Sequence, residues 1–163
     1  MANLLTTTIS GGLIHKEGTA TLSGTSLSID LSTGRTFEVD LQGATGNIAT
    51  FNITNFAGST YVSEFILNVK QGSTARSILW GSLTGVNPLW AGDGGSAGSG
   101  PTITATNDKI DIYKFSSWNG GNSWYGRVIG LKYYWQVYKV QQLMEQSFIK
   151  KVLQLRMVLP FYK

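Results

Sequence analysis

Apolar and polar residues alternate almost without a break between residues 26 and 41. The apolar members are Leu27, Ile29 and Leu31 in a first run, and Phe37, Val39 and Leu41 in a second. A period of two places apolar side chains on one face of an extended strand and polar side chains on the other. Residues 32–35 separate the runs and include Gly34. The pattern therefore predicts two half-buried strands joined as a β-hairpin.

Further short apolar runs follow at intervals of about 8–12 residues, the rhythm of a sandwich or barrel. We expect these strands near residues 48–53, 61–69, 76–80, 102–106, 109–116 and 123–129. The turn before the last strand contains Asn119-Gly120, a dipeptide that accepts the positive φ angles of a tight hairpin. We therefore expect an all-β domain over residues 13–130, an antiparallel β-sandwich of jelly-roll type.

The two ends of the chain differ from this central domain. Residues 1–12 are expected to form an N-terminal arm, in which Leu4 and Leu5 provide a small apolar anchor. Residues 131–163 are expected to form a basic helical extension. Its apolar residues recur at steps of three or four: Val137, Val140, Met144, Phe148, Val152, Leu155 and Leu159. This spacing predicts an amphipathic helix over residues 136–158, which Pro160 ends.

Positive charge is concentrated in the extension. Residues 1–130 carry seven Lys/Arg against eight Asp/Glu, and residues 131–163 carry six against one. The two parts therefore have net charges of −1 and +5, which account for the overall charge of +4. A nucleic-acid-binding domain spreads its basic residues over a folded face. We therefore expect no nucleic-acid partner.

Three roles remain open for the predicted helix. In the first, the helix packs on its own β-domain or bundles with copies of itself. In the second it docks on an acidic capsid or tail surface, and in the third it lies on a membrane. The heptad-like steps favour a helix–helix seam, and a span of about three heptads needs support from the β-domain. The residues expected to serve oligomerisation or docking are Leu4, Leu5, Val137, Val140, Met144, Phe148 and Val152. A membrane is the least favoured of the three partners. The chain also contains no run of about 18 apolar residues, the length that a membrane-spanning helix needs.

The residues offer little for catalysis. The chain has no cysteine and one histidine, His15, which lies in a polar segment beside Lys16 and Glu17. A catalytic Ser-His-Asp arrangement needs a histidine that a buried acid orients. A transition-metal site would have to be built almost entirely from carboxylates. We therefore expect no metal and no cofactor.

Carboxylate pairs could in principle hydrolyse glycosidic bonds. Glu38 and Asp40 alternate with apolar residues, so we expect them on the solvated face of a strand. Asp108 is predicted to be a turn residue, and Asp111 is predicted to accept hydrogen bonds from the backbone of a neighbouring turn. We therefore expect no enzyme, and a polysaccharide depolymerase is the most distant alternative.

Aromatic residues in or beside loops are the strongest candidates for binding. Flat rings next to amide and carboxylate side chains suit carbohydrate, although loop aromatics also anchor protein interfaces. The candidate residues are Trp90, Asp93, Trp118, Asn119, Asn122 and Tyr125. Trp80 and Trp124 are instead expected to fill the core of the sandwich.

Several motifs in fixed order carry a resemblance to a known group of proteins. They are Ser28-Ile29-Asp30-Leu31-Ser32-Thr33-Gly34, Phe37-Glu38-Val39-Asp40-Leu41, Phe65-Ile66-Leu67-Asn68-Val69-Lys70-Gln71, Ile78-Leu79-Trp80, Asp111-Ile112-Tyr113-Lys114-Phe115 and Trp118-Asn119-Gly120-Gly121-Asn122-Ser123-Trp124-Tyr125-Gly126. In this order they resemble a β-sandwich module of tail-fibre and virion structural proteins from tailed phages, especially marine and cyanobacterial phages. The resemblance covers about two-thirds of the chain. The Gly/Ser-rich stretch between Trp90 and Pro101 and the extension from residue 131 depart from it.

The resemblance implies a non-enzymatic protein that is displayed on a virion and is often a homotrimer. We expect the tail-fibre type, assembled in the host cytoplasm, exposed on the particle and attached to host surface glycans. The alternative is a head decoration or cement protein that stabilises the capsid. Its arm and helix would then clamp capsid subunits, with many copies supplying avidity. In both cases the partners are further copies of the chain and other tail or capsid proteins.

Overall fold

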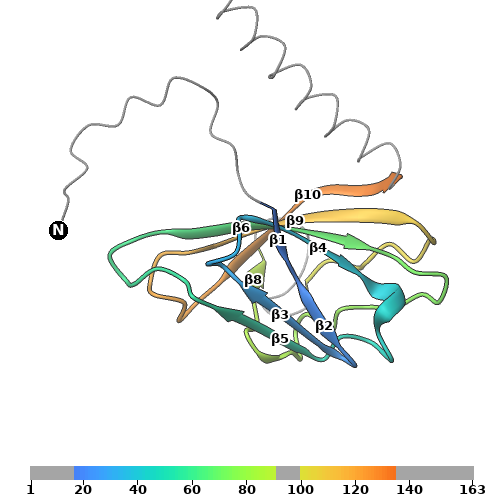
Figure 1. Ribbon diagram of the computed structural model, residues 1–163, viewed down its shortest axis with the longest axis horizontal. Helices are drawn as coiled ribbons and strands as arrows, with labels where there is room; N and C mark the ends of the chain where they lie inside the picture. The colour runs from blue at the N-terminus through green and yellow to red at the C-terminus, as the bar shows by residue number, and fades with distance from the viewer. Residues whose placement is uncertain (1–16, 91–99, 135–163) are drawn as a thin grey trace, which may run out of the picture.

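The computed structural model describes residues 17–90 and 100–134. In these residues the chain forms ten β-strands and one short 3-10 helix (Figure 1). The elements are β1 (Glu17–Thr19), β2 (Thr21–Ser23), β3 (Ser26–Asp30), β4 (Thr36–Asp40), η1 (Leu41–Gly43), β5 (Thr50–Thr54), β6 (Ser63–Lys70), β7 (Thr84–Gly85), β8 (Leu89–Trp90), β9 (Lys109–Ser117) and β10 (Tyr125–Tyr134). The described residues contain no helix that is long and apolar enough to cross a membrane. The predicted arm and the predicted C-terminal helix lie outside the described residues.

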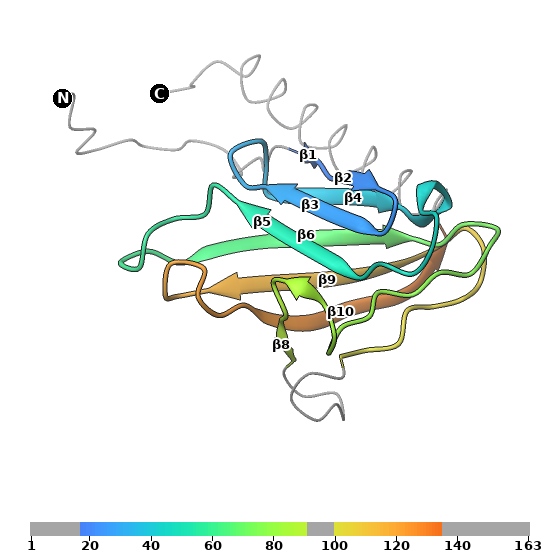
Figure 2. The ribbon, with the colours of Figure 1, turned by 90° about the horizontal axis from the view of Figure 1, so that it is seen from below.

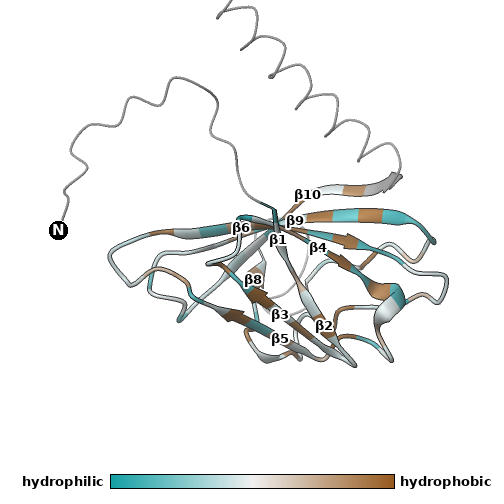
Figure 3. Cartoon of the chain, in the orientation of Figure 1, coloured by the Kyte–Doolittle hydropathy of each residue, from teal (hydrophilic) through white to brown (hydrophobic). Residues whose placement is uncertain are grey.

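The strands form two sheets that enclose one apolar core (Figure 2). The larger sheet has the order β1-β4-β6-β9-β10-β8, and the smaller has the order β2-β3-β5-β7. Apolar and polar residues alternate along β9, as Figure 3 shows, and the apolar ones that face the smaller sheet are buried. The expectation of an all-β domain is confirmed.

The sheets are mixed, so the expectation of a purely antiparallel sandwich is wrong. Five neighbouring pairs run parallel: β1–β4, β4–β6, β3–β5, β5–β7 and β8–β10. Three run antiparallel: β2–β3, β6–β9 and β9–β10. From β3 to β7, each successive strand lies in the other sheet. Each connection crosses from one sheet to the other, so strands two apart in sequence become neighbours in the same sheet. The chain reverses its direction at each of the two crossings between them, and such neighbours therefore run parallel.

The hairpin predicted over residues 26–41 is a further correction. Both strands form where the alternation predicts them, but β3 belongs to the smaller sheet and β4 to the larger. Ile29 and Phe37 are almost fully buried in the same core. The two apolar faces are therefore buried against each other across the core instead of side by side. Asp30 stabilises the corner between them, because its carboxylate accepts a hydrogen bond from the Ser32 amide at 2.9 Å.

The predicted hairpin around Asn119 is confirmed, because β9 and β10 pair antiparallel on either side of it. The strands predicted at 76–80 and 102–106 are wrong. Residues 76–80 make only an isolated bridge, between Ile78 and Ile48, and residues 102–106 form no strand. Ile78 and Ile103 are nevertheless buried. Their apolar side chains therefore serve the core without a place in either sheet.

Aromatic rings fill the centre of the core. Phe65 and Phe115 stack with their centroids 4.9 Å apart, and Trp124 meets Phe65 edge-on at 5.5 Å. Trp80 meets Phe51 in the same way at 6.1 Å. Trp80 and Trp124 are each only 2% exposed, which confirms their predicted place in the core. Such edge-to-face and stacked pairs add to the stabilisation that comes from burying their area.

Candidate functional site

Two loops lie side by side at one end of the domain (Figures 1 and 2). One joins β5 to β6 over residues 55–62, and the other joins β9 to β10 over residues 118–124. They are in close contact, since a methyl group added at Gly121 would come within 2.4 Å of the Phe56 ring. The second loop can approach so closely because Gly120 and Gly121 have no side chain and adopt φ angles of +65° and +80°.

Exposed apolar side chains gather at this end. Tyr61 is 70% exposed, Trp118 is 53% exposed, and Phe56 and Tyr125 are 38% and 37% exposed. We call these four residues the aromatic end. Val62 and Leu89 extend it, because Leu89 pairs with Tyr125 in the sheet and Val62 directly follows Tyr61.

Trp118 and Tyr125 form the most compact part of the aromatic end. Their ring centroids are 4.7 Å apart, and the ring planes are inclined by 53°. Tyr125 pairs with Ser116 in the register of β9 and β10, and Trp118 follows Ser116 by two residues. Side chains two apart on a strand share a face. The two rings therefore stand together on the outer face of the larger sheet.

The loop that carries Trp118 is tied together by its own polar side chains. The carboxamide oxygen of Asn119 accepts hydrogen bonds from the Ser117 hydroxyl at 3.1 Å and from the Ser123 amide at 2.9 Å. The Ser117 hydroxyl in turn accepts from the Gly121 amide at 3.1 Å. Asn122 donates to the Asn119 carbonyl at 2.9 Å. The two asparagines predicted as ligands thus also hold the loop that presents the ring.

The remaining candidate residues lie elsewhere. Trp90 is next to Leu89 on β8, but its ring packs inward against Trp80, with centroids 4.8 Å apart, and against Tyr113 at 5.7 Å. Asp93 lies outside the described residues, as do all seven predicted docking residues at the two ends of the chain. The structure therefore brings together Trp118, Tyr125 and the two asparagines, all from one hairpin.

Sequence reasoning missed Phe56, Tyr61, Val62 and Leu89. The loop of residues 55–62 is some 60 positions before the hairpin, and no local pattern connects the two. The only signal in the sequence is negative: residues 55–62 and 118–124 contain no charged side chain at all. Four aromatic residues in fifteen uncharged positions mark these loops as unusual for a solvent-facing surface.

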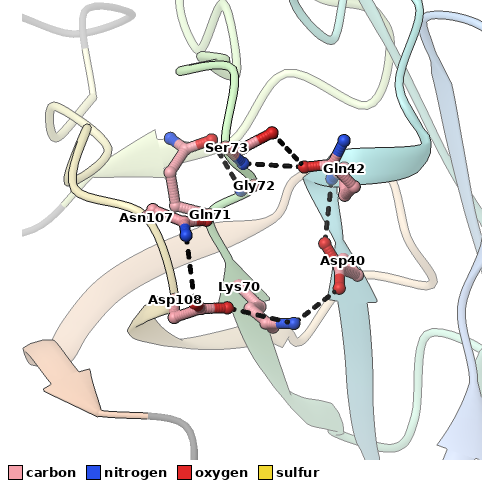
Figure 4. A network of polar contacts seen from close by, with 8 residues as sticks. All are labelled: Asp40, Gln42, Lys70, Gln71, Gly72, Ser73, Asn107 and Asp108. Carbon is pink, nitrogen blue, oxygen red and sulfur yellow. Dashed lines mark hydrogen bonds and ion pairs between the residues drawn. The ribbon is translucent and has the colours of Figure 1, made fainter.

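Three acidic residues of the candidate catalytic pairs, Asp40, Asp108 and Asp111, are held in polar networks away from the aromatic end. In Figure 4 Lys70 bridges two of them, with Asp40 at 2.8 Å and Asp108 at 3.4 Å. The hydrogen bond to Asp40 raises the pKa of Lys70 above its ordinary value. Asp108 lies in a turn with a φ angle of +59°. The ammonium group of Lys70 thus offsets the charge of two carboxylates that come from separate segments of the chain.

Asp111 accepts three hydrogen bonds inside the domain. The Thr104 amide and hydroxyl donate at 2.6 and 2.7 Å, and the Tyr113 hydroxyl donates at 3.3 Å. The prediction that Asp111 accepts from the backbone of a neighbouring segment is confirmed. Burial, and then the charge of Asp111, raise the pKa of Tyr113 well above its ordinary value. This carboxylate fastens residues 101–106 to β9.

A metal site and a surface hollow are the alternatives to the aromatic end. Among residues 17–90 and 100–134, no group of three or more acidic or histidine side chains is arranged to hold a metal ion. A hollow of about 320 Å³ lies between residues 77–82 and 100–102. Its described lining contains Trp80 and Pro101 but no acid, base or histidine. The aromatic end is therefore the stronger candidate site.

Comparison with known proteins adds nothing to this geometry. No protein-family model, no curated protein and no solved structure matches the chain. The aromatic end and the ordered sequence motifs are therefore the features that indicate a function.

Proposed function

We propose that this chain is a non-enzymatic virion structural protein of the tail-fibre type, displayed on a tailed-phage particle, and that its aromatic end binds host surface glycans. The observation that carries the proposal is the exposed pair of Trp118 and Tyr125, 4.7 Å apart on an internally hydrogen-bonded loop. The resemblance of the motifs to phage virion modules supports the location on a particle.

The chemistry of the aromatic end suits a neutral sugar. The face of an aromatic ring is electron-rich and attracts the C–H groups of a pyranose ring, while nearby amide groups hydrogen-bond its hydroxyls. Residues 55–62 and 118–124 contain no charge that would favour an anion or a nucleic acid. Asn119 and Asn122 carry carboxamide groups in the same loop as Trp118, and the Asn122 nitrogen donates to the Asn119 carbonyl at 2.9 Å.

A single shallow site of this kind binds weakly, so the proposal includes several copies. A homotrimer presents three aromatic ends to one cell surface, and linked sites gain avidity through their high effective concentration. The arm around Leu4 and Leu5 and the segment that follows β10 are the proposed links to neighbouring subunits or to other virion proteins.

The direct test is binding of the purified full chain to an array of bacterial surface polysaccharides. We expect Trp118→Ala to weaken binding at least tenfold, about 1.4 kcal/mol per site, because one of the two ring faces is lost. Ile129→Ala is the matched control, since Ile129 is also half exposed on β10 but is not part of the aromatic end. Equal binding by Trp118→Ala and the wild type would refute the glycan site.

The location on the particle has its own test, the copy number of this chain in purified virions. A few to a few tens of copies relative to the major capsid protein are expected for a tail component. Hundreds of copies would refute the tail-fibre assignment and would favour a head decoration protein instead.

A further inference from the structure

The outer face of the larger sheet is buried at one end although it points away from the core. Asn68 on β6 and Ile110 on β9 are 1% and 0% exposed. Both alternate with core residues such as Leu67 and Tyr113, so their side chains leave the sheet on the opposite side. At the other end of the same face, Trp118 is 53% exposed.

The two buried positions lie close together. In the register of β6 and β9, Asn68 pairs with Ile112, and Ile110 is two residues before Ile112 on the same face. Side chains on adjacent strands cover the flanks of an outward residue but leave its tip open to solvent. Nearly complete burial therefore requires something that lies on top of this half of the face.

The described elements do not supply that cover. The smaller sheet lies on the opposite side, and in Figure 1 none of the strands β2, β3 and β5 reaches the outer face of β4, β6 and β9. Ile110 is also buried without being a member of the central apolar core. These burial values belong to the single chain, so the cover must come from its own side chains outside those described, which begin at the end of β10.

We infer that residues 136–158 of the same chain lie as an amphipathic helix across this half of the outer face. The position where β10 ends is the first reason. Tyr134 pairs with Lys109 and Tyr133 pairs with Ile110, so the chain continues from residue 135 directly beside the buried positions. A neighbouring molecule would have to find this place without such a tether.

Length and chemistry agree with this occupant. A helix of residues 136–158 is about 35 Å long, and the six-stranded sheet is about 24 Å wide between its outermost strands. The helix brings one apolar stripe, and the face offers Ile66, Ile110 and Ile112. On this face the acids Glu38, Asp40 and Glu64 stand beside the cations Lys70 and Lys114, so the apolar side chains, and not charge, favour the helix.

Hydrogen exchange on the full chain tests the inference. We expect the amides of residues 136–158 to be protected in the wild type and to lose at least tenfold of that protection in Ile112→Asp. Ser116→Asp is the matched control, because it adds the same charge to the same face of β9, about 13 Å away and outside the buried half. An unprotected wild-type segment, or equal protection in Ile112→Asp, would overturn the inference.

A cross-link identifies the occupant independently of that variant. The chain has no cysteine, so each introduced pair is the only pair present. We expect Ile112→Cys with Val140→Cys to form a disulfide within one chain. We expect none with Gln142→Cys, which lies on the opposite side of the predicted helix. Disulfide-linked dimers would assign the face to a second copy, and equal linking or no linking at both positions would also refute the arrangement.

Discussion

Gln71 is a buried polar side chain whose contribution to the stability of the domain follows directly from its hydrogen bonds. It is 1% exposed and lies where β6 ends. Its amide nitrogen donates to the carbonyls of Arg76 and Thr104 at 2.8 and 3.0 Å. Its oxygen accepts from the amides of Arg76 and Gly72 at 3.0 and 3.2 Å. One side chain thus fastens residues 72–76 and residue 104 to the end of the sheet.

Gln71→Met keeps the length of the side chain and removes all four hydrogen bonds. Each bond contributes about 1 kcal/mol net, and a buried backbone group left without a partner costs about 1–3 kcal/mol. Arg76 and Thr104 are only partly buried, so water can replace part of the loss. We therefore expect a decrease of about 3 kcal/mol in the free energy of unfolding, and a fall in Tm of about 6–12 °C for a domain of this size.

Gln42→Met is the matched control, made at the nearby exposed glutamine. The Gln42 oxygen accepts from the Ser73 amide and hydroxyl at 2.7 and 2.9 Å (Figure 4). Since Gln42 is exposed, water replaces these bonds and the loss should stay below about 1 kcal/mol. Urea denaturation of the wild type and both variants measures how much each substitution lowers the free energy of unfolding. A loss for Gln71→Met that is no larger than that for Gln42→Met would refute the reasoning.

Two further predictions concern the loop glycine and the bridging lysine. Gly121→Ala should cost about 2–4 kcal/mol in urea unfolding, because φ is +80° and the methyl would meet the Phe56 ring at 2.4 Å. Gly58→Ala in the facing loop, where a methyl meets nothing within 4 Å, should change stability by less than about 0.5 kcal/mol. An equal loss in both variants would contradict this contact. Lys70→Met should lower stability by up to about 1 kcal/mol at pH 8, since the raised pKa of Lys70 means that folding favours its protonated form. That stabilisation is complete below the unfolded-state pKa of about 10.4 and is lost as pH rises through the folded-state pKa. Wild type and variant should therefore converge between pH 10 and 12, and a constant difference would contradict the ion pair with Asp40.

The amino-acid sequence by itself determines where most strands form and which side chains they bury. Leu27, Ile29, Phe37 and Val39 were all predicted on buried faces, and all are in the core. Burial depends on alternation along a single strand, which is a local property. The hairpin around Asn119 could be predicted for the same reason, since the backbone preference of its glycines acts over a few residues.

Only the tertiary structure decides which strand lies next to which. The two alternating runs at residues 26–41 looked like a hairpin, yet β3 pairs with β5 and β4 pairs with β6. Alternation specifies that one face is buried but not whether its partner is a neighbour in the same sheet or a strand across the core. The same limit applies to the candidate site. Trp118 and Tyr125 belong to one hairpin, so the sequence places them together. Phe56 comes to the same end of the domain, beside Gly121, only because the crossovers between the sheets bring residues 55–62 there.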